Sequence, residues 1–221
     1  MLKSRVEISY HYYLLTGEML LDAAELFAKG GPVMYLLLLC SIAVATIGIE
    51  RFRFYRYSIE DSKNFLYKLK DCLKTQNIDA GLALCSGKNN SIRMVARSGI
   101  EAVVNDGNVE LAMISVHDEE AMKLRAHLNY LSMIVTLAPL LGLLGTISGM
   151  IESFNIFNVQ SGQPLAITGG IGEALIATAT GLCVAIFALL VHTYFSQKLD
   201  EILAILEKTM NIILISFTRK V

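Results

Sequence analysis

Long apolar stretches separated by polar segments dominate the hydropathy pattern of this chain. Three of them, at residues 32–50, 128–151 and 171–195, are close to or above the ~20 residues that a helix needs to cross a membrane. An unpaired backbone group is costly in lipid, and strands of a barrel would be shorter and alternating, so stretches of this length are expected to be helices. The pattern predicts an all-α membrane protein with three transmembrane helices.

The composition supports a membrane class. Hydrophobic residues make up 54% of the chain, charged residues make up only 18%, and the mean hydropathy is +0.52. The net charge of −1 conceals a strong segregation, because no Lys, Arg or Asp occurs between Ala126 and Gln197. Soluble domains have a larger charged share and do not exclude charge from such a long stretch.

The distribution of Lys and Arg predicts the orientation in the membrane. Residues 51–127 contain twelve of them and the tail 196–221 contains four, whereas residues 1–31 contain three and residues 152–170 contain none. Loops rich in Lys and Arg stay in the cytoplasm. We therefore expect the amino terminus and the 152–170 link outside, and the 51–127 loop and the carboxyl terminus in the cytoplasm.

The segment 1–31 is expected to contain an amphipathic helix over Glu18–Lys29, lying at the outer membrane interface and ended by Gly30-Gly31-Pro32. One face of this helix would carry Met19, Leu20, Ala23, Ala24 and Phe27. The alternative is an extension of the first span. A cleavable signal is not evident, because the first strongly apolar window starts near residue 33 without a basic leader or a small-residue cleavage site.

The cytoplasmic parts are also predicted to be helical. In the 51–127 loop, apolar residues recur at helical spacing up to breaks at residues 86–91 and 105–108. Asn108 is a candidate N-cap for a helix that begins at Val109 and continues into the second span. The tail carries an apolar stripe from Leu199 to Ile213 that continues the third span. The second and third transmembrane helices are therefore expected to extend into a cytoplasmic helical domain.

The second span has a face of small and partly polar residues. At ~100° per residue, Pro139, Gly142, Thr146 and Gly149 fall on one narrow face. Gly145 and Gly149 form a GxxxG pair, which lets another helix approach closely. The face could line a polar path, or it could serve helix packing alone, with the Thr146 hydroxyl bonded to its own backbone.

The third span repeats this arrangement. One row of small residues contains Gly170, Ala174 and Thr178, and another contains Ala177, Gly181 and Ala185. Close helix contact is expected on both sides of this helix. Thr180 should lie near Glu173, whereas Thr178 lies well around the helix, so the two threonines could face different subunits.

Glu173 lies within an apolar run that continues to Phe195 without another charge. An ionised carboxylate in a span costs roughly 2.5 to 3.5 kcal/mol on insertion scales, so such a residue normally faces a cavity, a partner or a proton path. A dry carboxyl group favours its neutral form, which is the condition for taking up and releasing protons. The alternative is a static hydrogen bond to a neighbouring helix.

The string from Ala138-Pro139 through Gly145-Thr146 to Ser153-Phe154, followed by residues 170–178 and Gly181, closely resembles the MotA/TolQ/ExbB proton-channel family. The specific motif lies in residues 138–181, and the inferred topology agrees over nearly the whole chain. The Glu-Ala-Leu-x-Ala-Thr pattern at residues 173–178 is more similar to ExbB and TolQ than to the flagellar stator MotA.

The resemblance implies a homopentamer around two transmembrane helices of a single-span ExbD- or TolR-like subunit that carries an aspartate. By position, Glu173, Thr178 and Thr146 match the family's glutamate and two threonines, and would form the proton pathway beside that aspartate. The remaining motif residues, Pro139, Gly142, Gly145, Gly149, Thr180 and Gly181, would pack helices or line the pore. Glu152 departs from the family pattern; it either marks the outer mouth of the path or is a solvated charge at a helix end.

The resemblance further implies a multi-pass protein of the bacterial inner membrane, in contact with lipids, that couples proton-motive force to mechanical work on envelope partners. ExbB-like energy transduction through a TonB-like protein for TonB-dependent transport is the first hypothesis. TolQ-like envelope maintenance, or another motor, is the second. Protons are favoured over sodium, because few additional polar ligands accompany the path.

A structural membrane scaffold without ion conduction is the main alternative from another class, and it would tolerate replacement of Glu173. An intramembrane enzyme has little support, because the spans contain no paired carboxylates, metal-spaced His or Cys cluster, or nucleophile with a base. Cys40, Cys72, Cys85 and Cys183 have no metal spacing. We expect no cofactor, metal, nucleotide or nucleic acid, since there is no phosphate-binding glycine loop and topology explains the basic residues.

Overall fold

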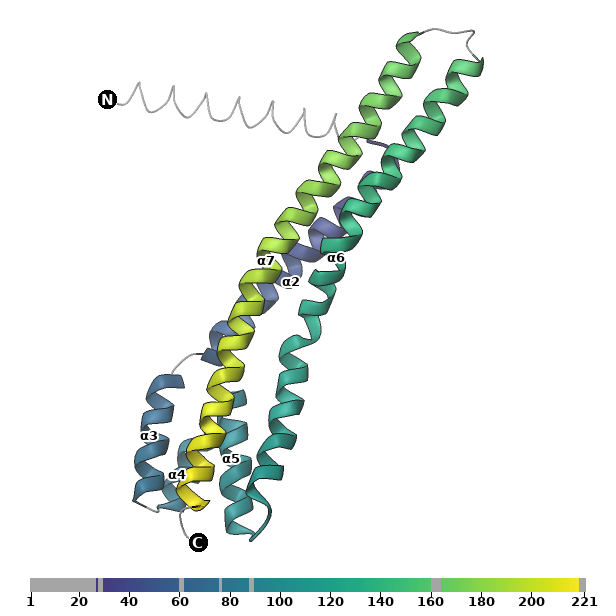
Figure 1. The fold of residues 1–221 in the computed structure, drawn as a ribbon. Helices are drawn as coiled ribbons and strands as arrows, with labels where there is room; N and C mark the ends of the chain where they lie inside the picture. The colour runs from purple at the N-terminus through teal and green to yellow at the C-terminus, as the bar shows by residue number, and fades with distance from the viewer. Residues whose placement is uncertain are drawn as a thin grey trace, which may run out of the picture. The chain divides into compact units, whose positions relative to one another are not determined.

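A computed structural model describes residue 27 and residues 30–59, 62–75, 77–87, 90–159 and 164–218. In this part of the chain all regular structure is α-helical (Figure 1). The helices are α2 (Val33–Ile59), α3 (Ser62–Lys74), α4 (Ile78–Cys85), α5 (Ser91–Val104), α6 (Val109–Val159) and α7 (Pro164–Thr218). The all-α prediction is confirmed. The expected interfacial helix at Glu18–Lys29 lies, apart from Phe27, outside the described residues.

Three of these helices are long and apolar enough to cross a membrane. The suitable segments are Val33–Arg56 in α2, Val109–Asn155 in α6 and Gly169–Phe217 in α7. They contain the second and third stretches that the hydropathy pattern selected, and all of the first except Pro32. The prediction of three transmembrane helices, of which the second and third extend into a helical domain, is therefore confirmed.

The helices extend farther than the apolar stretches. α2 continues past the charged cluster at Glu50–Arg53 to Ile59, because charged side chains end a membrane span without breaking a helix. α6 continues to Val159, and α7 already begins at Pro164. The chain contains no Gly or Pro between Glu152 and Val159, and proline suits the first position of a helix, where its missing N–H is not needed. The connection between α6 and α7 is correspondingly short.

Asparagine side chains cap the helices that follow the loops. Asn108 accepts a hydrogen bond from the Leu111 N–H at 3.0 Å, as expected for the start of α6. Asn90 accepts from the Ile92 N–H at 2.9 Å at the start of α5. Asn77 caps α4, a short helix that the periodicity did not separate from its surroundings. The breaks predicted at 86–91 and 105–108 are therefore confirmed.

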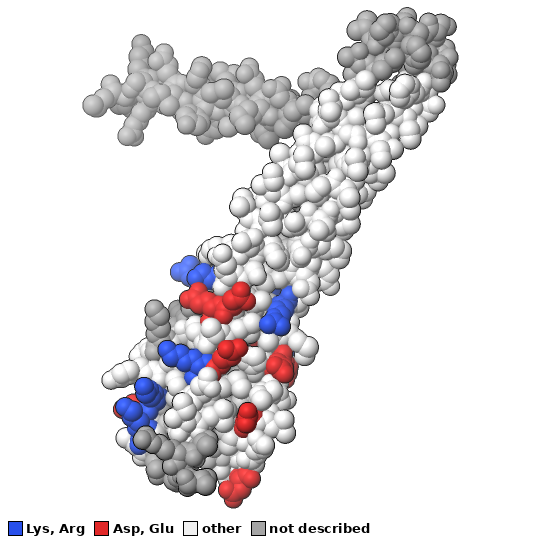
Figure 2. Space-filling model, in the orientation of Figure 1, with Lys and Arg blue, Asp and Glu red and all other residues white. Residues whose placement is uncertain are grey.

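The chain forms two compact units, and α2, α6 and α7 contribute to both. The first unit comprises residues 1–44 and 133–189, and the second comprises residues 45–132 and 190–221. The second unit has its own apolar core, which includes Leu69, Ile92, Val95, Ile100, Met113, Leu124, Ile202, Leu206 and Ile213. Figure 2 shows that the charged side chains on the visible face lie over the second unit. The visible surface of the first unit is uncharged.

The second unit buries an arginine from the charged cluster that ends the first span. The Arg51 guanidinium donates to the backbone carbonyls of Leu124, at 3.2 Å, and Lys123, at 3.4 Å. The Tyr55 hydroxyl donates to the same Leu124 carbonyl at 2.8 Å. Only 4% of the Arg51 surface is exposed, so this residue is buried between the helices of the second unit.

Candidate functional site

The candidate site lies in the first unit, where α6 and α7 pack backbone against backbone. A Cβ atom on Gly181 would lie 2.6 Å from the Ala138 carbonyl oxygen and 3.0 Å from the Gly142 Cα. A Cβ atom on Gly142 would lie 3.1 Å from the Thr178 Cα. Only glycine permits this approach, since the opposing atoms are backbone and cannot rotate away. The two helices are therefore in direct backbone contact here.

The GxxxG pair of α6 continues this contact along the same helix. A Cβ atom on Gly145 would lie 2.6 Å from the Ala177 Cβ, and one on Gly149 would lie 3.1 Å from the Ala174 Cβ. Gly170, at the next turn of α7, faces Ser153 of α6. Both small-residue rows of α7 thus contribute to the contact with α6, although close contact was expected on two sides of the helix.

The threonine hydroxyls donate to backbone carbonyls. Thr178 Oγ1 donates across the contact to the Gly142 carbonyl at 3.0 Å. Thr146 Oγ1 donates to the Leu143 carbonyl at 2.6 Å, and Thr180 Oγ1 donates to the Ile176 carbonyl at 2.8 Å, both within their own helices. Thr178 therefore joins α6 to α7 in this state. Each hydroxyl oxygen keeps lone pairs that can accept a further hydrogen bond.

Glu173 lines a cavity of about 20 Å³ beside this contact. A single water molecule needs roughly 10–15 Å³, so the cavity has the size of one water. Its wall is formed by Gly30, Gly31, Pro32, Val33, Gly145, Ser148, Gly149, Glu152, Glu173 and Ala174. Among the described residues no side chain or backbone group forms a hydrogen bond or an ion pair with the Glu173 carboxylate.

The structure does not bring the three predicted pathway residues together: Glu173 lies apart from Thr146 and Thr178. Glu173 and Thr178 are five residues apart, so they lie about 140° apart around α7, on either side of the row that contacts α6. On α6, Ser148 and Glu152 line the Glu173 cavity, whereas Thr146 does not. Thr146 is one turn from Gly142, the residue that accepts the Thr178 hydrogen bond. Glu173 therefore lies with Glu152 on one edge of the helix pair, and the two threonines lie toward the other edge.

Pro139 does not line this cavity, and Thr180 does not either. Sequence reasoning placed Thr180 near Glu173 but left Glu152 without a settled role. Glu152 follows Gly149 by three residues, which puts it near the same side of α6 as the cavity-lining Gly145. The sequence shows this helical spacing on α6. It does not show which turn of α6 lies beside Glu173.

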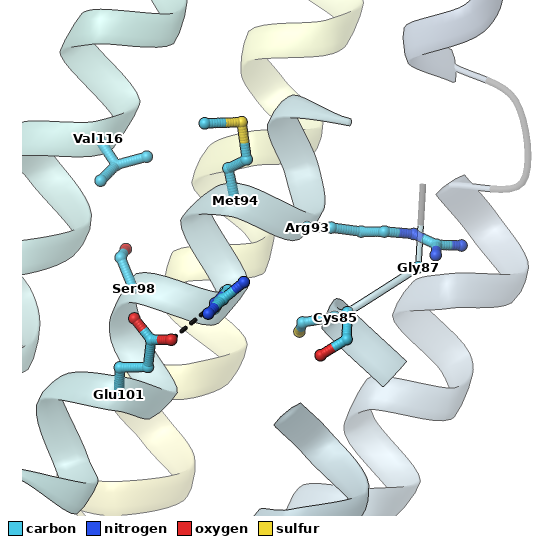
Figure 3. Close-up of a pocket in the computed structure, with 9 residues that line it drawn as sticks. Cys85, Gly87, Arg93, Met94, Ser98, Glu101 and Val116 are labelled. Carbon is cyan, nitrogen blue, oxygen red and sulfur yellow. Dashed lines mark hydrogen bonds and ion pairs between the residues drawn. The ribbon is translucent and has the colours of Figure 1, made fainter. Parts of the chain in front are cut away.

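A second and larger cavity, of about 260 Å³, lies in the second unit between the α4–α5 connection, α5 and α6 (Figure 3). Figure 3 shows the Arg93 side chain extending toward Gly87. The Arg93 guanidinium stacks over Phe65 at 5.3 Å, and Arg97 Nε lies 2.6 Å from Glu101 Oε1. The bond to Glu101 raises the pKa of Arg97. The charged groups of this cavity are thus engaged within the chain.

Cys85 also borders the larger cavity. Burial raises the pKa of its thiol to about 11, so the thiol is protonated at neutral pH and is a poor nucleophile or metal ligand. Within the described residues, no three His, Cys, Asp or Glu side chains are arranged to hold a metal ion.

Comparison with known proteins points to one family. A model described as the MotA/TolQ/ExbB proton channel family matches residues 87–208, which is more than half of the chain and includes the whole α6–α7 contact. The match also covers Glu152, Glu173, Thr146 and Thr178.

Individual relatives agree with this match. A protein of Synechocystis sp. named biopolymer transport protein ExbB-like 1 is 35% identical over 188 residues, which cover 81% of this chain and 74% of the relative. ExbB-like 3 of the same organism is 34% identical over 194 residues, which cover 84% of this chain and 91% of the relative. The Tol-Pal system protein TolQ of Pseudomonas aeruginosa is 33% identical over 113 residues, or 50% of this chain and 48% of TolQ. The chain is therefore a membrane protein that belongs to the MotA/TolQ/ExbB proton channel family.

Proposed function

We propose that this chain is the proton-conducting stator subunit of an energy-transducing complex, and that Glu173 binds and releases the transported proton. The observation that carries the proposal is the position of the Glu173 carboxyl group. It lines a water-sized cavity, it lies in an apolar helix, and no described residue of the chain neutralises it. A carboxyl group in such a place is free to change its protonation state as a partner approaches.

Thr146 and Thr178 are proposed to line the same path from a neighbouring subunit. They lie toward the edge of the α6–α7 pair opposite Glu173, so one chain does not bring all three residues together. In a ring of identical subunits, one edge of each helix pair faces the other edge of the next. We propose a homopentamer in which this pairing places the threonine hydroxyls beside the aspartate of an ExbD- or TolR-like single-span subunit.

The proposed location is the bacterial inner membrane. In the proposed orientation, residues 1–31 and 152–170 are outside, and residues 51–127 and 196–221 are in the cytoplasm. The support is the charge bias, since residues 51–127 hold twelve Lys and Arg while residues 152–170 hold none. The transmembrane segments are proposed at the three apolar stretches, with lipid around the ring.

The proposed physiological role is ExbB-like energy transduction for TonB-dependent transport. The names of the two Synechocystis relatives support it, and their similarity covers more of this chain than that of TolQ does. A proton that moves across 100 mV releases about 2.3 kcal/mol, so several protons would drive one mechanical stroke. A TolQ-like role in envelope maintenance uses the same site with other envelope partners.

The test is replacement of Glu173 by Gln and by Asp in the complete complex, with proton flux measured in proteoliposomes. Glu173→Gln removes the titratable group at nearly constant volume, and we expect flux to fall by at least about a hundredfold, in the range for loss of a proton-transfer group. Glu173→Asp keeps a carboxyl group and should retain part of the flux. Glu207→Gln, at an exposed position in the second unit, is the matched control.

A structural scaffold predicts a different result from the same experiment. Glu173→Gln would then leave both proton flux and partner-dependent energy transduction at the wild-type level. That outcome would refute the proposed proton role of Glu173.

A further inference from the structure

Glu152 shares the Glu173 cavity, although it lies on a different helix and near the end of its apolar stretch. Both carboxyl-bearing residues line the space of about 20 Å³ beside the α6–α7 contact. Gly149 contacts Ala174, the residue after Glu173, so Glu173 lies at the level of Gly149. Glu152 is three residues farther along α6, which is ~4.5 Å along the helix axis. This axial offset is short enough for two flexible glutamate side chains to meet at one water molecule.

The surroundings of the cavity leave both carboxyl groups available. The described residues of the first unit contain no Lys or Arg, so no basic side chain among them holds either carboxylate in an ion pair. Apart from the two acids, Ser148 is the only cavity-lining residue of α6 or α7 with a polar side chain. The remaining wall is glycine, alanine and valine together with Pro32.

The turn before α2 forms part of the cavity wall. Gly31 has a φ of 69°, in the left-handed region that glycine adopts without strain, and it places Gly30 and Pro32 in the cavity wall. Val33 approaches the Cβ position of Gly145 at 3.7 Å. The cavity wall is therefore built from three separate parts of the chain, and the two glutamates border it as exposed residues.

We propose that Glu152 is a proton-transfer residue that supplies Glu173 from the extracytoplasmic side through one water molecule in this cavity. The protonated Glu152 carboxyl group gives its proton to the water oxygen, and the same water gives a proton to the Glu173 carboxylate. Water is regenerated, Glu173 becomes neutral, and Glu152 becomes an anion that takes its next proton from bulk water. Proton transfer through a single water is within the reach of positioned acid and base groups.

This role rests on the proposed function of Glu173. It assigns a function to Glu152, which the family resemblance does not explain. If Glu152 were only a solvated charge at a helix end, its place beside Glu173 in the wall of one cavity would have no function. Proton entry from outside would then reach Glu173 directly.

The test measures proton flux in proteoliposomes that contain this chain with its co-expressed single-span partner. We expect Glu152→Gln to lower the flux at least about tenfold, since a proton donor is lost while the side-chain volume is kept. Glu152→Asp should recover part of the flux. Glu207→Gln is again the control, and the amount of assembled complex is measured for each variant.

A second readout separates proton delivery from a structural role. A membrane-impermeant buffer such as MES, added on the extracytoplasmic side, should raise the flux of Glu152→Gln several-fold, because the buffer acid replaces the missing donor. The wild-type flux should not respond. A structural defect would be insensitive to the buffer.

The outcomes for the two glutamates are distinguishable. Loss of flux in Glu173→Gln with wild-type flux in Glu152→Gln would overturn the role of Glu152 and leave the proposed function intact. Wild-type flux in Glu173→Gln would overturn both. A loss in Glu152→Gln that Asp does not recover and buffer does not relieve would also overturn the delivery role.

Discussion

At the scale of single residues, the hydroxyl and carboxyl groups of the site differ in what they are bound to. The Thr178 hydroxyl is used in a hydrogen bond between helices, whereas Glu173 has no partner among the described residues. A residue that is bonded across a helix contact contributes to stability as well as to any path. Replacement of Thr178 therefore changes both the stability of the helix pair and the proposed proton path, and the two effects must be measured separately.

Thr178→Val should destabilise the α6–α7 pair by about 1 kcal/mol, because it removes the hydrogen bond to the Gly142 carbonyl at nearly constant shape. Thr178→Ser keeps the hydroxyl and should remain close to wild type. Thr180→Val is the matched control, since that hydroxyl bonds only to its own helix at Ile176. Thermal unfolding in detergent measures the relative stabilities of these variants. Equal stability of the two valine variants would contradict the prediction.

The Cys85 thiol should react slowly with iodoacetamide in the folded protein. Its pKa is raised by burial from 9.0 to about 11, so at pH 8 the reactive thiolate is ~100-fold scarcer than in an unperturbed cysteine. The rate should rise about tenfold per pH unit up to about pH 11. A variant that keeps only Cys85 would be compared with one that keeps only Cys72, and a plateau near pH 9 would disprove the shift.

The same pKa shift affects stability in alkaline solution. The folded state holds the Cys85 proton more tightly than the unfolded chain does, so the free energy of unfolding should fall as pH rises from 9 toward about 11. Below pH 9 this group should have no effect. Cys85→Ala should remove this contribution, which urea unfolding at several pH values would measure.

At the scale of helices, the close contact of α6 with α7 depends on backbone that cannot move aside. A methyl group on Gly181 would meet the Ala138 carbonyl and the Gly142 Cα, whereas one on Gly172 would meet nothing within 4 Å. The two glycines lie on the same helix, and of the two only Gly181 faces α6. Their substitution therefore isolates the effect of the contact.

Gly181→Ala should destabilise the protein by about 1–3 kcal/mol, the usual range for an extra methyl group in a packed interior. Gly172→Ala should be neutral or stabilising by up to about 1 kcal/mol, because alanine favours the helix. Thermal unfolding of both variants in the same detergent checks this difference. A greater loss in Gly172→Ala than in Gly181→Ala would contradict the packing seen here.

The helices were predictable because their signals are local. The apolar stretches, the Asn108 cap and the breaks at 86–91 and 105–108 each depend on a few neighbouring residues. The ends of α2 and α6 were less predictable, because an apolar stretch marks a membrane span and not the limits of a helix. The expected amphipathic helix at 18–29 remains a prediction.

The composition of the site was predictable only in part. The GxxxG pair indicated a close helix contact, but not that both small-residue rows of α7 would share it. The register of α6 against α7 decides that Glu173 shares a cavity with Glu152 rather than with Thr146. Register arises from the packed backbone contact, and one sequence does not reveal it. The burial of Arg51 likewise depends on carbonyl groups more than 70 residues away.

At the scale of the whole molecule, charge divides between the two units. The described residues of the first unit contain no Lys or Arg, whereas the second unit contains a buried apolar core and basic residues on each of its helices except α4. This division suits a first unit surrounded by lipid and a second unit in water. The division alone does not determine on which side of the membrane the second unit lies. The positive-inside rule predicts the cytoplasmic side.

Thiol labelling of intact cells should establish that orientation. In a variant that keeps only Cys72, a membrane-impermeant maleimide should react only after the inner membrane is opened, since Cys72 lies in the basic second unit. In a cysteine-free background, Ser161→Cys should react with the same reagent once the outer envelope is permeable. The reasons are the twelve basic residues of the 51–127 loop and the absence of any in the 152–170 link. The reverse pattern would place the link in the cytoplasm, and proton delivery through Glu152 from the extracytoplasmic side would then be impossible.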